Sequence, residues 1–123
     1  MTLEELYQRI GGSYASALMG AMNDEAYLRR MLEKFVAQNY YGYISESYKR
    51  RDFKAVNESA KRMKVNAGNL GIIPLYNGAA GIVDRTMYVA PGNFVDLTAD
   101  LNVLKIDYDS IMANIRTYLM SSY

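Results

Sequence analysis

The sequence contains no cysteine and no histidine among its 123 residues. Without cysteine the chain can form no disulfide, thiolate metal site or cysteine nucleophile, which fits a reducing compartment. Without histidine it lacks the usual general base near neutral pH, the commonest metal ligand and any histidine that could accept a phosphoryl group. We therefore expect a protein that is not an enzyme and that holds neither a metal nor an organic cofactor.

An excess of charge of one sign is also missing, because 14 Lys and Arg oppose 13 Asp and Glu for a net charge of +1. No strong field therefore draws the chain toward nucleic acid or an acidic membrane. No apolar run approaches the roughly 20 residues of a membrane span, and the N-terminal MTLEELYQRI is too acidic for a signal peptide. We expect a soluble, cytoplasmic monomer that binds neither nucleic acid nor membranes.

Helical signals begin at the N-terminus. Thr2, followed three residues later by Glu5, forms a capping box, and Gly11-Gly12 is a stop signal, so we predict a short helix over residues 3–10. For residues 13–22 we expect either a second short helix or a structured connection.

A long helix is expected next, because Asn23-Asp24 can cap its free amides and apolar residues continue at helical spacing to about Arg50. The positions predicted to form its buried face are Leu28, Leu32, Phe35, Ile44 and Tyr48.

The clearest helix follows, with Asp52 as its N-cap and Gly71 as its end. Its apolar residues recur every three or four positions and form one narrow stripe. The stripe consists of Phe53, Val56, Ala60, Met63, Ala67 and Leu70.

Pro74 suits the first turn of another helix, since its missing amide would be unpaired there. After a turn at residues 90–93, a last helix is expected from 94 or 95 to 119, with an irregularity around Asp107. The predicted inner faces are Leu75, Ala79, Ile82 and Thr86 on the first of these helices, and Ile111, Ile115, Tyr118 and Leu119 on the second. With no strand pattern, repeat or linker, residues 1–123 predict one all-α domain, an antiparallel up-and-down four-helix bundle with a short N-terminal capping helix.

The stretch SAKRMKVNAGNLG at residues 59–71 resembles the signature of histidine-containing phosphotransfer domains, the helical-bundle phosphate carriers of two-component phosphorelays. That signature is roughly H-x-L-K-G followed by small residues, often A-G-N-L-G. Met63, Lys64 and Ala67-Gly68-Asn69-Leu70-Gly71 match it. The resemblance also covers LEELYQRIGG near the N-terminus and the Pro74-Leu75 helix start, and it implies receiver domains and histidine kinases as partners.

Two departures fall on the functional face that the resemblance implies. Lys61 stands at the phosphoacceptor histidine, and Val65 stands at the glycine one turn later. An exposed lysine, with an ordinary pKa near 10.4, is almost entirely protonated at neutral pH and has no lone pair to offer. The branched side chain of Val65 would obstruct the approach of a receiver domain.

Lys61 and Val65 are expected to share an exposed strip with Asn57, Lys64 and Gly68, and we predict that this strip binds a partner. A plain solvated helix face is the alternative.

Three tyrosines within Tyr40-Tyr41-Gly42-Tyr43 cannot all face inward, so Tyr40 and Tyr41 are further candidates for partner binding, with packing on a neighbouring helix as the alternative. Tyr7, Tyr27, Tyr108 and Tyr118 are predicted to lie in the core or at its edge. Helix-interior glycines at 42, 78 and 81 indicate close approach of a neighbouring helix or of a partner.

These features lead to three functional hypotheses. The first is a non-catalytic phosphotransfer-like module that binds receiver or kinase partners without carrying phosphate. The second is a phosphotransfer scaffold, repurposed in nature or engineered, whose altered surface at Tyr40, Tyr41, Lys61 and Val65 binds an unrelated protein. The third, in which Lys61 acts as an amine nucleophile, is the weakest, because it needs a dry pocket or cationic neighbours that lower its pKa.

Overall fold

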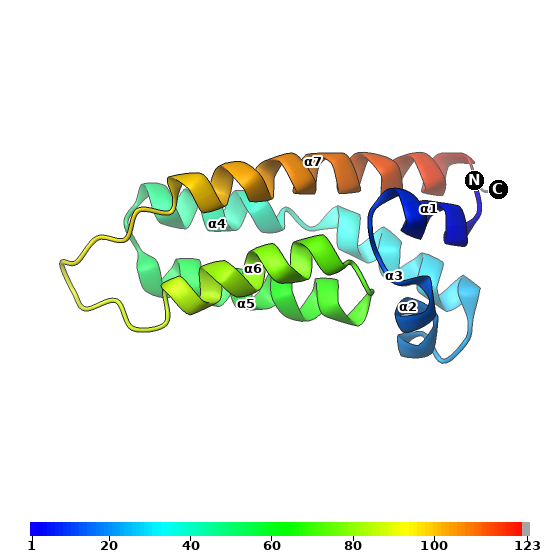
Figure 1. Ribbon diagram of the computed structural model, residues 1–123, viewed down its shortest axis with the longest axis horizontal. Helices are drawn as coiled ribbons and strands as arrows, with labels where there is room; N and C mark the ends of the chain where they lie inside the picture. The colour runs from blue at the N-terminus through cyan, green and yellow to red at the C-terminus, as the bar shows by residue number, and fades with distance from the viewer. Residues whose placement is uncertain (122–123) are drawn as a thin grey trace.

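A computed structural model describes residues 1–121, and every regular element within that range is a helix (Figure 1). The all-helical expectation is therefore confirmed. The expected domain of residues 1–123 includes 122 and 123, which lie outside the described range. The helices are α1 (Leu3–Arg9), α2 (Tyr14–Gly20), α3 (Glu25–Ala37), α4 (Tyr40–Lys49), α5 (Phe53–Asn69), α6 (Ile73–Arg85) and α7 (Thr98–Ser121).

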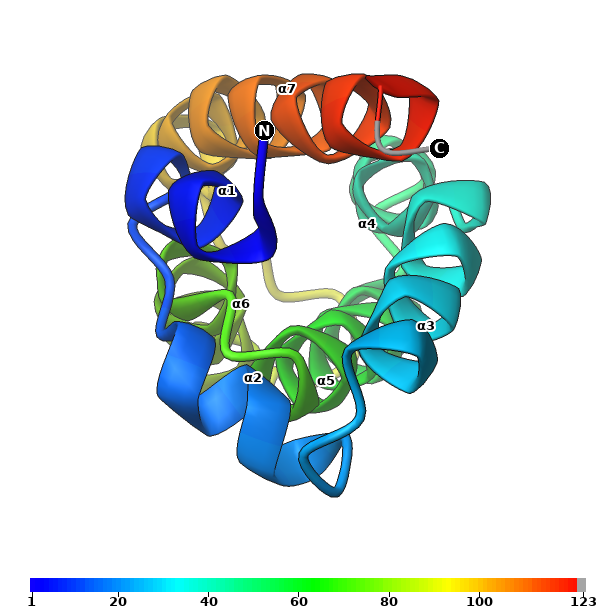
Figure 2. The same cartoon turned by 90° about the vertical axis from the view of Figure 1, so that its right-hand side faces the viewer.

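The longest helix, α7, extends along the helical part of the molecule (Figure 1). In one half of this part, α4 and α6 lie beside α7, and α5 lies across the core from it (Figure 2). The short helices α1 and α2 and the helix α3 occupy the other half. Viewed along the long axis, the helices surround a shared core (Figure 2). Side chains without exposed surface in this core include Leu28, Leu32, Ile44, Val56, Ala60, Met63, Ala67, Leu75, Ala79, Ile82 and Ile115.

Helix starts were the boundaries best predicted by local chemistry. The side chains of Thr2, Asp24 and Asp52 each accept a hydrogen bond from a backbone amide in the first turn of the following helix, as expected. Ser13 caps α2 in the same way, which settles residues 13–22 in favour of a second short helix. Gly11 and Gly71 follow the C-terminal ends of α1 and α5. Their φ angles are +68° and +65°, the left-handed conformation that glycine adopts without strain.

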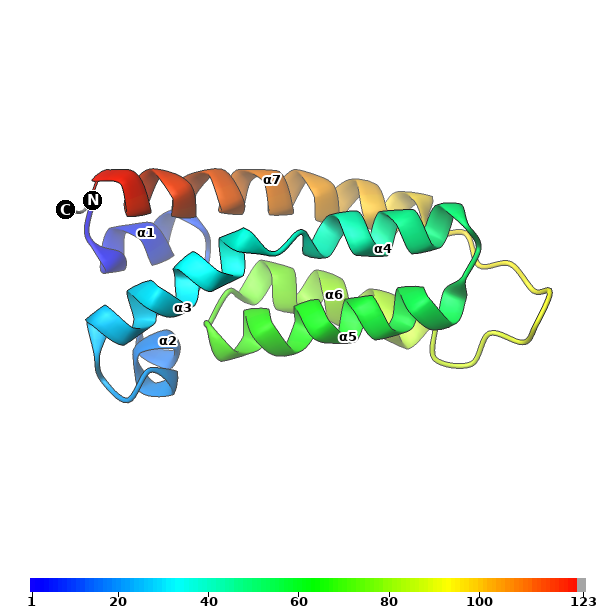
Figure 3. The same cartoon turned by 180° about the vertical axis from the view of Figure 1, so that it is seen from behind.

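The single long helix predicted from residues 23–24 to 50 is wrong, because the chain breaks at Gln38 and Asn39 and forms α3 and α4 (Figure 3). Gln38 is extended, with ψ of 139°, and the Asn39 side chain accepts from the Gly42 amide at 3.0 Å. Gly42 serves this cap, since a Cβ there would come within 2.3 Å of the Asn39 side chain. Apolar spacing continues across the break, so periodicity alone gave no sign of it.

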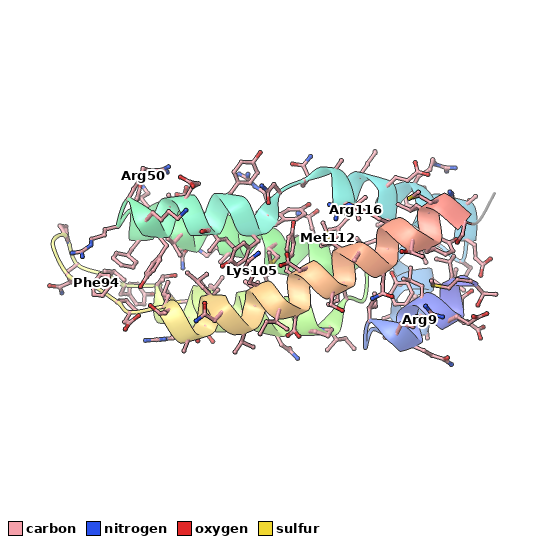
Figure 4. The ribbon with its side chains drawn as sticks, turned by 90° about the horizontal axis from the view of Figure 1, so that it is seen from above. Arg9, Arg50, Phe94, Lys105, Met112 and Arg116 are labelled. Atoms are coloured by element: carbon pink, nitrogen blue, oxygen red, sulfur yellow. The ribbon has the colours of Figure 1, made fainter. Side chains whose placement is uncertain are left out.

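The last helix begins at Thr98, later than predicted, and no irregularity interrupts α7 at Asp107. The Asp96 carboxylate accepts from the Thr98 amide at 2.9 Å, and Arg85 at the end of α6 pairs with Asp100 in the first turn of α7. The connecting loop projects from one end of the molecule, and Phe94 lies in it near the end of α4 that carries Arg50 (Figure 4).

The N-terminal segment is tied to the end of α5 by two hydrogen bonds. The Tyr7 hydroxyl, which is buried, donates to the Leu70 carbonyl at 2.6 Å, and the Ser13 amide donates to the Gly71 carbonyl at 2.9 Å. Both bonds satisfy carbonyl groups that follow the last turn of a helix and would otherwise lack partners. Burial raises the pKa of the Tyr7 hydroxyl well above its ordinary value of 10.0.

We predict that this tyrosine makes the fold sensitive to alkali. Because the folded state keeps the Tyr7 proton, the stabilisation is complete below pH ~10, and it declines above that by up to ~1.4 kcal/mol per pH unit. Tyr7→Phe should cost about 1 to 3 kcal/mol at neutral pH by leaving the Leu70 carbonyl unpaired, yet flatten the alkaline decline. Urea denaturation between pH 8 and 11 measures both effects. Parallel pH profiles for the two proteins would contradict the assignment.

Candidate functional site

The outer surface of α5 carries the two residues that depart from the phosphotransfer motif. Lys61 and Val65 are both exposed, Val65 with 58% of its surface accessible, and they lie one turn apart. Gly68 is exposed and Lys64 is half-buried. On the opposite side of α5, all six residues of the predicted apolar stripe are buried, so the rotational register of this helix was predicted correctly.

Asn57, predicted to bind a partner on this strip, is instead buried between α5 and α6, with 8% of its surface exposed. Its amide nitrogen donates to the Val83 carbonyl at 3.0 Å and to the Thr86 hydroxyl at 3.1 Å. The prediction is therefore wrong, and Asn57 joins two helices. The apolar stripe defined the direction of the core but not the side on which α6 packs, and Asn57 lies on that side.

Tyr76 on α6 completes the site, although no sequence motif marked it as a candidate. The Lys64 ammonium lies 5.7 Å from the centroid of the Tyr76 ring, a cation–π contact. The same ring lies against Gly68, where an added Cβ would come within 3.0 Å of it. The only available signal was that Tyr76 falls outside the inner face defined by Leu75 and Ala79, which predicts exposure but no contact.

A shallow pocket of about 190 Å³ adjoins Gly68 and Tyr76, with Ile73 and the α2 residues Ser13 and Ser16 also in its lining. Ile73 is exposed. We call the surface formed by Lys61, Lys64, Val65, Gly68, Ile73 and Tyr76 the α5–α6 face. In the part of the chain that the structure describes, neither of its lysines forms an ion pair, so the face offers two cations without a carboxylate partner beside exposed apolar side chains.

Tyr40, also predicted to bind a partner, is buried with 5% of its surface exposed, and its ring centroid lies 4.9 Å from that of Phe35. Burial raises the pKa of its hydroxyl. The predicted role of Tyr40 in partner binding is therefore wrong. Tyr40 instead packs within the bundle, which was the alternative. The exposed residue of the group is Tyr43, as expected for three tyrosines that cannot all face inward.

Tyr41 is half-buried and packs on α7. Its ring centroid lies 5.9 Å from that of Tyr108 and 5.5 Å from the Lys105 ammonium, which Figure 4 shows on α7. Tyr41 is therefore no free binding surface. Among the tyrosines expected in the core or at its edge, Tyr27 is exposed and the other three are buried.

We expected a neighbouring helix or a partner to approach closely at the helix glycines, and the structure differs between Gly78 and Gly81. At Gly78 on α6, an added Cβ would come within 2.9 Å of Leu104 on α7, so close helix packing accounts for this glycine. No atom lies within 4 Å of the corresponding position at Gly81, so no neighbouring helix accounts for it.

Lys61 lacks the buried setting that would favour its action as a nucleophile. It is exposed to water, whereas an amine nucleophile needs a desolvated or strongly cationic setting. Among residues 1–121, no three acidic side chains come close enough to hold a metal ion, and none of the helices combines the length and apolar character needed to cross a membrane.

Comparison with known proteins adds no identity. The chain matches no protein-family model, no curated protein and no solved structure. The residues of the α5–α6 face and the motif at residues 59–71 are therefore the features of this chain that bear on its function.

Proposed function

We propose that this chain is a non-catalytic interaction module of the phosphotransfer type, which binds a receiver domain or a histidine kinase without carrying phosphate. The observation that carries the proposal is the exposed pair Lys61 and Val65 on a helix whose remaining motif residues keep their expected places. Met63 and Ala67 are buried, Gly68 is exposed and Gly71 ends the helix. The scaffold would be an antiparallel up-and-down four-helix bundle in which α3 and α4 together form one member.

The α5–α6 face has the mixture of groups found at protein interfaces. Exposed apolar surface at Val65, Ile73 and Tyr76 provides area that can be removed from water. Lys61 and Lys64, which form no ion pair in the described residues, provide electrostatic steering toward an acidic partner. Lys61 excludes phosphate transfer in this proposal, because an ammonium group has no lone pair with which to attack a phosphoryl group. The protein would act as a monomer in the cytoplasm, by occupying its partner.

A second candidate function uses the same face for an unrelated protein. The observation that favours it is Val65, an exposed β-branched residue in the middle of a helix, for which folding gives no reason. Under this alternative the phosphotransfer scaffold, natural or engineered, has lost its original partners. Tyr40 and Tyr41 have no part in it, since one is buried and the other packs on α7.

We predict that Val65→Glu weakens binding of a receiver domain or histidine kinase about tenfold, because it places a buried charge at the centre of the interface. Val103→Glu is the matched control, since Val103 is equally exposed but lies on α7, away from the α5–α6 face. Isothermal titration calorimetry with a panel of receivers and kinases measures both. If the two variants bind equally well, the α5–α6 face is not the interface. If no receiver or kinase binds the unmodified protein, the unrelated partner becomes the better proposal.

A further inference from the structure

A second concave surface lies on the other side of α5 from the α5–α6 face. It is a groove of about 480 Å³ between α3, the break at residues 38–39 and the C-terminal half of α5. Its accessible apolar surface, which we call the apolar floor, comes from Tyr27, Met31 and Ala37. The lining residues Phe35, Tyr40 and Leu70 are almost fully buried beneath it. A volume of this size is typical of sites that accept several side chains or a small ligand.

The rim of the groove is basic. Lys34 from α3 and Arg62 from α5 line it, and none of its lining residues is acidic. In the described residues 1–121 neither cation forms an ion pair, although Glu58 lies one turn before Arg62 on the same helix. Tyr27, also in the lining, carries the Arg30 guanidinium 5.6 Å from its ring centroid, which adds positive charge at one end.

Uncharged hydrogen-bonding groups from α5 also line the groove. Asn66 donates its side-chain nitrogen to the Arg62 carbonyl at 2.8 Å, which leaves its side-chain oxygen available as an acceptor. The Asn69 side chain is exposed and makes no hydrogen bond within the described part of the chain. An amide of this kind can both donate to and accept from the backbone of an extended peptide.

We propose that this groove binds a short acidic segment of a partner protein, with an apolar side chain on the floor and carboxylates against Lys34 and Arg62. The apolar floor favours a peptide over a small inorganic anion, because an anion would leave that surface uncovered. Charge complementarity favours acidic flanks, since the rim carries cations and no carboxylate. A nucleic acid is disfavoured, because its affinity depends on many phosphate contacts and the chain has a net charge of only +1.

The test uses the full chain and a fluorescein-labelled peptide with glutamates on both sides of a leucine–phenylalanine pair. Fluorescence anisotropy should show saturable binding, and amide NMR shifts should map to residues around Phe35, Gln38 and Asn69. Lys34→Glu and Arg62→Glu should each weaken binding about tenfold, since reversal replaces an attraction by a repulsion. Lys54→Glu is the matched control, because Lys54 is an exposed lysine on α5 that lines no part of this groove and forms no ion pair with any residue of the described range 1–121.

Several outcomes would overturn the proposal. Equal loss of binding in Lys54→Glu and Arg62→Glu would show that net charge, not the groove, attracts the peptide. Tight binding of a matched peptide with lysines in place of the glutamates would exclude charge recognition. If inorganic phosphate alone produced the same NMR shifts and displaced the peptide, the site would be a small-anion site; displacement by a single-stranded oligonucleotide at lower concentration would make it a nucleic-acid site.

Two further variants keep the test independent of folding and of the proposed function. Arg62→Gln removes the charge without reversing it and should weaken binding less than Arg62→Glu, with unchanged helicity by circular dichroism. Ile73→Ser, which removes exposed apolar surface from the α5–α6 face without adding a charge, should leave the acidic peptide's affinity unchanged, because Ile73 lies on α6 and does not line the groove. The groove and the α5–α6 face can therefore succeed or fail separately.

Discussion

Met63→Ala is expected to lower the free energy of unfolding by about 2 to 5 kcal/mol, whereas Lys61→Ala should change it by less than ~0.5 kcal/mol. Met63 has no exposed surface and faces the core from the middle of α5, so truncation removes apolar contacts and leaves a cavity. Lys61, two residues earlier, is exposed and forms no ion pair in the described residues. Urea denaturation at neutral pH measures the difference directly.

Lys54→Ala provides a baseline for this comparison, because it is the same substitution at another exposed site of α5. Lys61→Ala and Lys54→Ala should be indistinguishable within ~0.5 kcal/mol. A loss at Lys61 as large as the loss at Met63 would mean that α5 is rotated relative to the structure described above.

The second large effect concerns phosphate transfer. We expect the unmodified protein to accept no phosphate, Lys61→His to accept it poorly, and Lys61→His combined with Val65→Gly to accept it clearly better. The histidine supplies a nucleophile that is largely neutral near pH 7, and the glycine removes a branched side chain one turn away on the same surface. In-line transfer depends on close approach and orientation, so both changes are needed.

A radiolabelled receiver domain or kinase that phosphorylates an intact phosphotransfer domain measures this transfer. Lys61→Gln with Val65→Gly is the matched control, because it opens the surface without supplying a nucleophile. A phosphoramidate on the unmodified protein, stable in base and labile in acid, would show that Lys61 is no dead site. Equal transfer by the single and double variants would show that Val65 does not obstruct docking. An inactive but folded double variant would favour the unrelated-partner proposal.

Local chemistry explains why parts of the fold were predictable from sequence. Each N-cap depends on one side chain and the amide three residues later, so Thr2, Asp24 and Asp52 could be read from the chain alone. The α5 stripe was equally clear, because an apolar residue every third or fourth position leaves only one inward direction. Lys61 and Val65 were therefore predicted to be exposed, because they lie on the side of α5 that faces away from this apolar stripe.

The incorrect predictions concern residues whose surroundings a single-helix pattern does not reveal. Each of these residues contacts a neighbour that is distant in sequence, or forms a local hydrogen bond that competes with the helix. Asn39 looked like one more residue of a long helix, yet its side chain caps a new one. Asn57 looked exposed until the position of α6 was known, and Tyr76 was missed because its partners Lys64 and Gly68 lie on another helix. A pattern within one helix reports which way is inward but not which helix lies alongside.

The hydrogen bonds from the N-terminal segment to the end of α5 set an order of events during synthesis. Tyr7 and Ser13 are translated well before their acceptors Leu70 and Gly71, and 63 residues separate Tyr7 from Leu70. Until then α1 and α2, of 7 residues each, are far below the length at which an isolated helix is stable. Since α1 also packs on α7, we expect α1 to become ordered only after α7 has been synthesised.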